Sequence, residues 1–89
     1  MKAVISVLGK DRVGIIARVS GYLAEQQVNI LDISQTILGD YFVMIMLVEP
    51  LAANPDLPAL AKQLSEVGES LGVQIHIQHE AVFTAMHRI

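Results

Sequence analysis

Cysteine and tryptophan are absent from this 89-residue chain, and two tyrosines and two phenylalanines are its only aromatic residues. Without cysteine, the chain forms no disulfide framework, no thiolate metal site and no thiol nucleophile. So few aromatic rings leave little surface for stacking the bases of a nucleic acid. Basic residues are also scarce, since six Lys and Arg stand against nine Asp and Glu, a net charge of −3. This balance argues against a protein that binds a phosphate backbone.

Long hydrophobic runs are missing as well. The longest strictly apolar stretch spans about eight residues, 41–48, whereas a membrane-spanning helix needs roughly 20. The first residues contain no apolar segment followed by a cleavage site, so we expect no secretory signal and a cytoplasmic location. The length suits one domain over residues 1–89, because a chain this short does not bury two independent cores.

Apolar residues are present in excess. The chain is 53% hydrophobic and only 17% charged, whereas an ordinary soluble domain has about 25% charged residues. A domain of this size buries only about two-thirds of the surface that its unfolded chain exposes. Part of the apolar surplus is therefore expected at the surface, which predicts association with a second copy or with a partner.

The spacing of the apolar residues predicts four strands, two helices and a short tail. We expect strands over 2–8, 28–38, 41–49 and 73–78. We expect helices over 13–27 and 57–71, and a helical tail over 80–89. Asp56 is suited to cap the second helix at its start, and Gly72 is suited to end it.

Three details of these elements are open to test. On the first helix, the stripe expected to face the core falls at helical spacing and consists of Ile16, Val19, Ser20 and Leu23, with Ile15 and Tyr22 flanking it. On the second strand, the side chains of 31, 33 and 37 are expected to share one face. Gly21 interrupts the first helix, where it is either merely tolerated or marks a close approach to a neighbouring backbone.

The order β-α-β-β-α-β with right-handed crossovers predicts an α+β, ferredoxin-like fold. Its sheet has four antiparallel strands in the spatial order 4-1-3-2, with two helices on one face and a short C-terminal helical tail. Residues 41–48 are apolar at every position, so this strand should be central and covered on both faces. The tail residues expected to cover the helix-free face, in the same chain or in a partner, are Val82, Phe83, Met86 and Ile89.

The segment 9–15 joins the first strand to the first helix. Asp11 is suited to be the helix N-cap, and Arg12 to supply a charge-assisted hydrogen bond. Free amides and the positive end of the helix dipole favour an anion such as a carboxylate, and Gly14 keeps the position open. The alternative is a capped turn without a ligand.

Asn29 begins the second strand just after a helix end. Its amide donates and accepts hydrogen bonds, which suits an amino-acid zwitterion. The alternative is that Asn29 only satisfies backbone groups at this junction.

Catalytic and metal chemistry find little support. His76 and His79 lie three residues apart on a strand, so their side chains point to opposite faces and do not share a metal ion. The serines have no evident histidine and acid beside them. We therefore expect no catalytic residues, no metal and no cofactor. A small enzyme of the acylphosphatase type, to which Arg12 and Asn29 are superficially suited, is the weakest of the alternatives.

The motif of the first loop resembles a known family. The residues that carry the resemblance are Gly9-x-Asp11-Arg12-x-Gly14-Ile15, then Leu23-Ala24, then Val28-Asn29-Ile30. They resemble the ACT domain, a small-ligand regulatory module of amino-acid metabolism, in the form found in formyltetrahydrofolate deformylases and the glycine cleavage system repressor. The stretches 29–36 and 79–86 are similar to the free-standing ACT proteins of the UPF0237 group.

The resemblance implies a homodimer or higher homo-oligomer with its ligand at the interface between protomers, near the first loop. The ligand-binding positions that it implies here are Gly9, Asp11, Arg12, Gly14, Ile15 and Asn29. Serine-sensing members have His and Asn where this chain has Gly9 and Asp11. A carboxylate at Asp11 suits an α-amino group but repels a second carboxylate, so serine is not the expected ligand.

The expected protein is a non-catalytic regulatory domain that binds an amino acid or a related metabolite. It would act on a metabolic enzyme or a regulator, with no direct contact to nucleic acid or membrane. The alternative is a ligand-free dimerisation or interaction module whose first loop is only structural. The sequence leaves open whether dimers form through sheet edges or sheet faces.

Overall fold

The computed structural model describes residues 1–10 and 14–86. The strands are β1 (Ala3–Lys10), β2 (Val28–Leu38), β3 (Tyr41–Pro50) and β4 (Val73–His79). The helices are α1 (Ile15–Glu25), α2 (Leu57–Leu71) and α3 (Glu80–Met86). The predicted elements are thus confirmed, with ends that differ by one or two residues.

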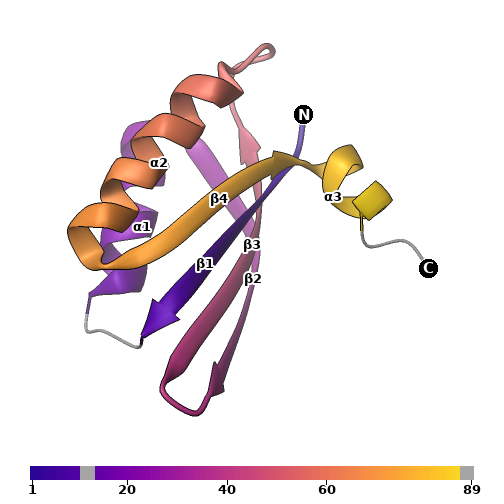
Figure 1. Cartoon of the computed structure of the whole chain (residues 1–89). Coiled ribbons are helices and arrows are strands. Elements are labelled where there is room, and N and C mark those ends of the chain that lie inside the picture. Colours follow the sequence, from indigo (N-terminus) through magenta and orange to yellow (C-terminus); the bar gives the residue numbers. More distant parts are fainter. Residues whose placement is uncertain (11–13, 87–89) are drawn as a thin grey trace.

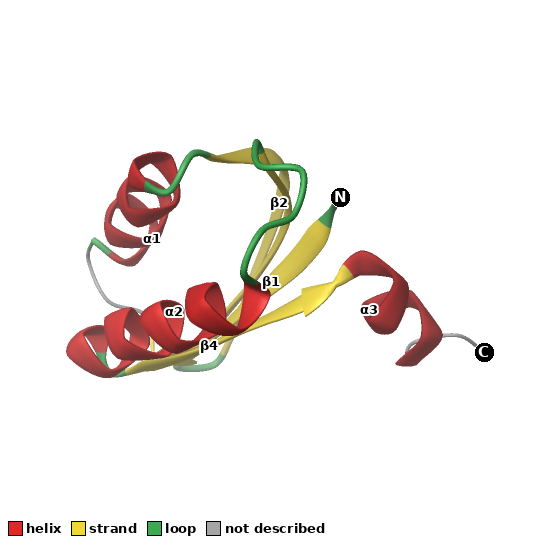
Figure 2. Cartoon of the chain, turned by 90° about the horizontal axis from the view of Figure 1, so that it is seen from above, coloured by secondary structure: helices red, strands yellow, loops and turns green. Residues whose placement is uncertain are grey.

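The four strands form one antiparallel sheet in the order β2-β3-β1-β4. This is the predicted order 4-1-3-2 read from the other edge. Helices α1 and α2 cover the same face of the sheet, and α3 lies on the other side beyond the end of β4 (Figures 1 and 2). The fold is therefore the predicted ferredoxin-like one, with β1 and β3 in the centre.

The core lies between the sheet and helices α1 and α2. The strands contribute alternate residues, as a period of two requires, and each helix contributes one row. The buried hydrophobic residues of this layer are Ala3, Ile5, Val7, Ile15, Val19, Leu23, Val28, Phe42, Met44, Met46, Val48, Leu64, Val73 and Ile75. The methionines fill the centre of β3 because an unbranched thioether adapts to irregular gaps.

Helix α1 buries Val19 and Leu23 as predicted, but it buries Ile15 in place of Ile16. Ile15 is 2% exposed, whereas Ile16 is 40% exposed. The buried row is Ile15, Val19 and Leu23, spaced by four residues, and Ile16 points away because successive residues are turned by about 100°. The prediction for Ile16 is therefore wrong. A Cβ atom at Gly21 would meet no neighbouring element within 4 Å, so within the described part of the chain this glycine marks no close approach.

Helix α2 begins and ends as predicted. The Oδ1 atom of Asp56 accepts a hydrogen bond from the Ala59 amide at 3.1 Å. Gly72 ends the helix in a left-handed conformation, with φ of 73°. Gly68 is buried against β4, where a Cβ atom would lie 2.6 Å from the Val73 carbonyl oxygen. This glycine allows α2 to approach the sheet closely.

Strand β2 contains an irregularity that the sequence did not reveal. Ile30 pairs with Val48 and Asp32 pairs with Leu47, so Leu31 is an extra residue in the ladder. The bulge resets the alternation, and it places Ile30 and Ile33 both on the helix side. Leu31 therefore does not share a regular face with Ile33, and its side chain is 46% exposed.

The face of the sheet opposite α1 and α2 is called the open face here. Its side chains follow from the strand register. The middle of the open face consists of Asp32, Ser34 and Thr36 of β2, Val43, Ile45 and Leu47 of β3, Val4, Ser6 and Leu8 of β1, and Gln74, His76 and Gln78 of β4, and its ends carry Asn29, Leu38, Tyr41, Glu49 and Lys10. The two central strands thus contribute mainly apolar residues and the two edge strands polar ones.

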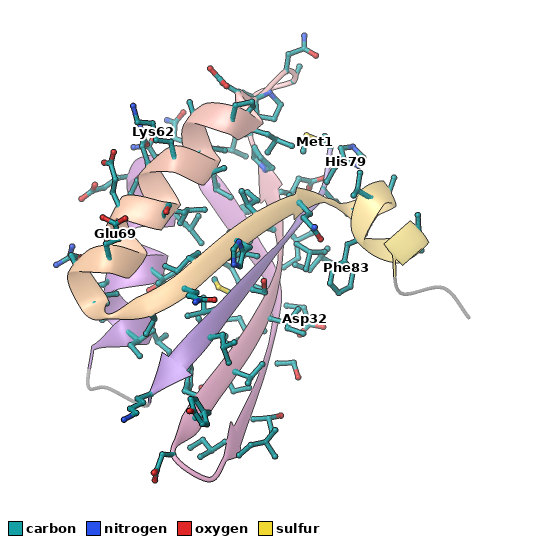
Figure 3. All side chains as sticks on the ribbon, viewed as in Figure 1. Met1, Asp32, Lys62, Glu69, His79 and Phe83 are labelled. Carbon is teal, nitrogen blue, oxygen red and sulfur yellow. The ribbon has the colours of Figure 1, made fainter. Side chains whose placement is uncertain are left out.

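Helix α3 covers only one corner of the open face. It contacts β4 and β1 of its own chain, and the Glu80 amide donates a hydrogen bond to the Lys2 carbonyl oxygen at 3.0 Å. Phe83 is half-buried and points from α3 back toward the sheet (Figure 3). Val82 is 50% exposed. Within its own chain the described part of the tail therefore covers only part of the face. Covering in a partner stays a prediction, and the side chain of Met86 and the whole of Ile89 lie outside the described residues.

None of the helices in the described ranges 1–10 and 14–86 is long and apolar enough to cross a membrane.

Candidate ligand site

The start of α1 is an uncapped helix end. Gly14 occupies the N-cap position with φ of 91°, and no side chain caps the helix there. The first helical hydrogen bond runs from the Arg18 amide to the Gly14 carbonyl oxygen at 2.9 Å. The amides of residues 15–17 precede this bond and have no acceptor within the helix. They lie at the positive end of the helix dipole, which favours a bound anion.

The N-cap residue of α1 is thus Gly14 and not the predicted Asp11. Glycine adopts a positive φ without steric cost, which suits it to this position. Asp11 and Arg12 themselves lie outside the described residues.

A pocket of about 560 Å³ opens beside this helix end. Its lining residues are Gly14, Ile15, Ile16, Ala17, Gln35, Ile37 and Phe42. The pocket exists because the β2–β3 hairpin extends past the start of α1 (Figure 1), so the helix does not cover the end of β2. Ile37 accordingly remains 60% exposed. A volume of this size lies in the usual range for small-molecule sites, about 300–1,000 Å³.

The walls of the pocket are mostly apolar. Ile16 of α1, Ile37 of β2 and Phe42 of β3 all line the pocket, and Phe42 is the buried one of the three. The polar groups of the described residues are the amides of residues 15–17, which have no acceptor within the helix, and the side chain of Gln35. No lining residue within the described ranges carries a charge. This arrangement fits a molecule with one anionic group and an uncharged, partly apolar remainder.

The structure brings two of the six predicted site residues, Gly14 and Ile15, into this pocket. Gly9 has a packing role, since a Cβ atom there would lie 2.5 Å from Cγ1 of Val73 on the neighbouring strand. It lines a different, smaller pocket of about 310 Å³ at the same end of the sheet. The absence of a side chain at Gly9 is thus explained by the β1–β4 contact.

Asn29 lies at the other end of the sheet. It pairs with Glu49, whereas Ile37 beside the pocket pairs with Phe42. The eight residues that separate Asn29 from Ile37 span roughly 25 Å of strand. Within one chain, Asn29 and the pocket therefore do not contact the same small molecule.

Five lining residues were not predicted from the sequence: Ile16, Ala17, Gln35, Ile37 and Phe42. Two of them, Ile37 and Phe42, could have been paired from the sequence, because a tight two-residue turn at Gly39 and Asp40 places them opposite each other in the hairpin. The exposure of Ile16 has no such local signal. It depends on which row of α1 packs on the sheet.

Two polar side chains outside the pocket, those of His79 and Arg18, have hydrogen-bond partners with a structural role. His79 Nδ1 accepts a hydrogen bond from the Ala81 amide at 3.0 Å, at the start of α3. Arg18 Nη2 donates to Ser70 Oγ at 3.3 Å, between α1 and α2. In residues 1–10 and 14–86 no group of three or more His, Asp or Glu side chains is arranged to hold a metal ion.

Tyr22 is the titratable group with a resolved shift. Its hydroxyl donates a hydrogen bond to Gln63 Oε1 of α2. Burial raises the pKa of Tyr22 above its ordinary value, and the carboxylates of Glu25 and Glu66 raise it further. The group lies between the two helices, away from the pocket at the start of α1.

The ACT domain family model matches residues 2–78, which include helices α1 and α2, strands β1 to β3 and all of β4 except its last residue. The chain belongs to the ACT domain family. Members of this family are typically regulatory domains that bind small ligands, so the class expected from the first loop is confirmed.

Within the family, the full-length relatives are UPF0237 proteins. One from Methanocaldococcus jannaschii is 53% identical over 88 residues, which cover 99% of this chain and 98% of the relative. The structure of an ACT domain protein from Streptococcus pneumoniae is similar over 98% of both chains, with a TM-score of 0.86 and 46% identity.

Two more distant structures share the fold alone. A formyltetrahydrofolate deformylase from Pseudomonas putida has a TM-score of 0.77 and 15% identity, over 88% of this chain and 28% of the enzyme. A putative glycine cleavage system transcriptional repressor has a TM-score of 0.73 and 23% identity, over 86% of this chain and 44% of the repressor. In both proteins the ACT fold is one part of a longer chain.

Proposed function

We propose that this protein is a non-catalytic regulatory domain that binds an amino acid or a related metabolite in the pocket at the start of α1. The observation that carries the proposal is the composition of that pocket: three helix amides without helical acceptors stand beside an apolar wall. The amides bind the carboxylate of the ligand. Membership of a family that is typically regulatory supports the same function.

The walls favour a ligand whose side chain is uncharged. Ile16, Ile37 and Phe42 offer apolar contact, and a charged group placed against them would lose hydration without gaining a partner. Asp11 and Arg12 precede Gly14 in the chain. In this proposal Asp11 binds the α-amino group and Arg12 adds a charge-assisted bond to the carboxylate.

A homodimer brings Asn29 to the site. Strand β2 is an edge strand of 11 residues whose outer side pairs with no other described strand. If two copies pair antiparallel along β2 about a two-fold axis, the start of one strand lies against the end of the other. With full overlap, the end of β2 that carries Asn29 lies beside the partner's Ile37 at the mouth of the pocket, although the register on β3 puts the Asn29 side chain on the open face and Ile37 on the helix side. The protomers then share two equivalent sites.

Calorimetric titration of the chain with each of the twenty amino acids tests the proposal. We expect at least one amino acid with an uncharged side chain to release heat, and Asn29→Ala to weaken its binding about tenfold by removing a hydrogen bond to a charged group. Asn54→Ala is the matched control, because Asn54 is an exposed asparagine in the loop before α2. Absence of heat for all twenty would refute amino-acid binding.

A second pair of variants tests the location of the site. Ile37→Gln removes an apolar wall of the pocket, whereas Leu38→Gln changes the adjacent residue on the other face of β2. Both side chains are similarly exposed, at 60% and 65%. We expect about tenfold weaker binding for Ile37→Gln and no change for Leu38→Gln. Equal effects would place the ligand elsewhere.

In the cell, the proposed role is cytoplasmic: ligand binding changes the association of this domain with a metabolic enzyme or regulator. A ligand shifts such an association only if the two states bind it with different affinity. The second candidate is a ligand-free interaction module, and the apolar residues of the open face favour it. The titrations above separate the two, because an interaction module binds no amino acid.

A further inference from the structure

Gln35 is a polar residue on the apolar, helix-facing side of the sheet. Its partner in the ladder on β3 is Met44, whose side chain is fully buried beneath the helices. Residues that lie directly opposite each other in an antiparallel pair share one face, so Gln35 points to the helix side as well. The positions before and after it on this side of β2 are Ile33 and Ile37, which are both apolar.

Gln35 is also an exception in the sheet as a whole. The strand register assigns a face to each paired position, and the helix-side positions carry hydrophobic residues, Gly9 or Pro50, apart from Gln35 and His79. His79 is the last residue of β4 and accepts a hydrogen bond from the Ala81 amide. The side chain of Gln35, by contrast, makes no hydrogen bond to any residue in 1–10 and 14–86. The fold described by these residues therefore does not use its carboxamide.

The position of Gln35 along β2 places it where the cover by the helices ends. On the helix side of this strand the exposed fraction rises from 6% at Val28 to 38% at Ile33 and 60% at Ile37. Gln35 lies between the last two, is itself exposed and lines the pocket at the start of α1. Among the described lining residues it is the one with a polar side chain.

A carboxamide in an otherwise apolar wall discriminates between ligands by hydrogen bonding. Its NH₂ group donates and its oxygen accepts, and water satisfies both groups while the side chain is exposed to solvent. A ligand that fills the pocket displaces this water. An aliphatic side chain then leaves the carboxamide without a partner, which weakens binding, whereas a hydroxyl or a carboxamide restores the lost hydrogen bonds.

We propose that Gln35 selects the ligand: the pocket binds amino acids whose side chain is uncharged and ends in a hydrogen-bonding group. This inference rests on the proposed function, in which the amides of α1 hold the carboxylate. Those amides and Gln35 belong to different walls of the pocket, α1 and β2. A ligand held by α1 thus presents its side chain to β2, where Ile37 contacts the apolar stem and Gln35 binds the polar end.

The alternative is that Gln35 only keeps an edge strand polar, because polar residues on edge strands oppose aggregation. The opposite side of β2 already serves this purpose with Asp32, Ser34 and Thr36. On the helix side Gln35 stands alone between two isoleucines. A residue needed only for solubility has no effect on which ligand binds, so ligand preference distinguishes the two roles.

Calorimetric titration with pairs of amino acids of similar shape tests the inference. The pairs are threonine and valine, asparagine and leucine, and tyrosine and phenylalanine, whose members differ mainly in one hydrogen-bonding group. We expect the wild-type chain to bind the hydrogen-bonding member of at least one pair about fivefold more tightly than its counterpart. Gln35→Met keeps the length of the side chain, removes its polar group and should abolish this preference.

Gln74→Met is the matched control. Gln74 is an exposed glutamine on the other edge strand, β4, and it points to the open face. We expect this variant to keep the preference of the wild-type chain. Far-UV circular dichroism shows whether each variant is folded.

Gln35→Glu provides a second test that remains available if Gln35→Met does not fold. A carboxylate at this position attracts a cationic ligand side chain. We expect Gln35→Glu to bind lysine about fivefold more tightly than the wild-type chain does. Unchanged lysine binding by the folded variant would contradict contact between Gln35 and the ligand side chain.

The outcomes separate this inference from the proposed function. If no amino acid releases heat with the wild-type chain, the proposed function fails and the selection by Gln35 fails with it. If amino acids bind but the members of every pair bind equally, selection by Gln35 alone is overturned. The same holds if folded Gln35→Met keeps the preference or if Gln74→Met also loses it. Loss of the preference in Gln35→Met alone supports both.

Discussion

At the scale of single residues, the surroundings of two glycines show which one has a packing role and which one lines the pocket. Gly9 was a candidate ligand residue, yet its missing side chain is explained by Val73, which a Cβ atom would approach to 2.5 Å. Gly14 has open space around it and a φ of 91°, and it stands at the mouth of the pocket. Of the two glycines in the motif, Gly14 is therefore the one whose surroundings support a ligand.

We expect Gly9→Ala to lower the free energy of unfolding by about 1–3 kcal/mol, because the added methyl group overpacks the β1–β4 contact. Gly21→Ala is the matched substitution in open space. It should raise the free energy of unfolding by up to about 1 kcal/mol, since alanine favours the helix. Urea unfolding of both variants measures the difference. A neutral Gly9→Ala would contradict the packing role.

Tyr22 makes the stability of the protein depend on alkaline pH. Its pKa is raised in the folded state, first by burial and then by Glu25 and Glu66, whereas in the unfolded chain it is about 10. The unfolded state therefore loses its proton first as the pH rises. The contribution of Tyr22 to stability is complete below about pH 10 and is lost as the pH rises toward the folded pKa.

Thermal unfolding between pH 8 and about 11 measures this effect. We expect Tyr22→Phe to flatten the fall in melting temperature at the alkaline end. Tyr41→Phe should not, because Tyr41 is an exposed tyrosine at the end of β3. If the two variants follow the wild-type curve equally, Tyr22 is not the group responsible.

At the scale of elements, the two main helices begin in different ways. Helix α2 is capped by a side chain, Asp56, and has a proline in its first turn. Helix α1 begins at a left-handed glycine with no side-chain cap. The amides at the start of α2 thus include one with a side-chain acceptor, whereas those at the start of α1 have no cap from Gly14. This contrast is the reason why the proposed anion site is at α1.

We expect Asp56→Ala to lower the free energy of unfolding by about 1 kcal/mol, because the Ala59 amide loses its acceptor. Asp40→Ala, in the exposed β2–β3 turn, is the control and should change stability less. Chemical denaturation measures both. Amino-acid binding should be unchanged in Asp56→Ala, since the start of α2 is not part of the pocket.

At the scale of the whole molecule, the sheet has three surfaces with different roles. The helix side holds the core and the pocket, the β2 edge is free to pair, and the open face is apolar along its midline. The apolar surplus of the sequence is thereby located. Part of it lies in the open face and part at the end of β2, where Ile37 and Leu38 are exposed.

Mixing two defective variants tests whether the ligand site spans two protomers. Asn29→Ala damages one half of the proposed site and Ile37→Gln damages the other. In a mixed dimer, the pocket of the first variant meets the intact Asn29 of the second, so one site is restored. We expect an equal mixture to recover about a quarter of the wild-type sites, since half of the randomly formed dimers carry one intact site.

Titration of the mixture against each variant alone provides the measurement. No recovery after subunits have exchanged would show that Asn29 and Ile37 do not serve the same site. A mixture of Asn29→Ala with the wild-type chain calibrates the extent of exchange.

Much of the fold was predictable because it depends on local patterns. These patterns act over a few residues each. They are the apolar alternation in 73–78, the helical spacing in 57–71, the helix ends at Asp56 and Gly72, and the turn at Gly39. Their consequences are confirmed in α2, β4 and the hairpin. The buried row of α1 was predicted correctly at Val19 and Leu23 but wrongly at its first residue, because apolar residues at both 15 and 16 leave that choice to the packing against the sheet.

The candidate site was predictable only in part. The first loop indicated Gly14 and Ile15, but the remaining wall comes from β2 and β3, about 20 residues further along the chain. The bulge at Leu31 sets which residues of β2 face α1, and nothing in the local sequence marks it. Asn29 was predicted to act together with the first loop, although the strand register places it at the opposite end of the sheet from the pocket.

The sequence alone determines the order of the elements, their caps and turns, and the apolar character of both faces of β3, because these depend on side chains within a few residues of one another. The tertiary structure decides the rest: which row of α1 is buried, how far α3 covers the open face, and that the start of α1 and the end of β2 enclose a pocket. Those outcomes depend on contacts between distant segments, and such contacts exist only once the sheet has formed with its particular register and bulge.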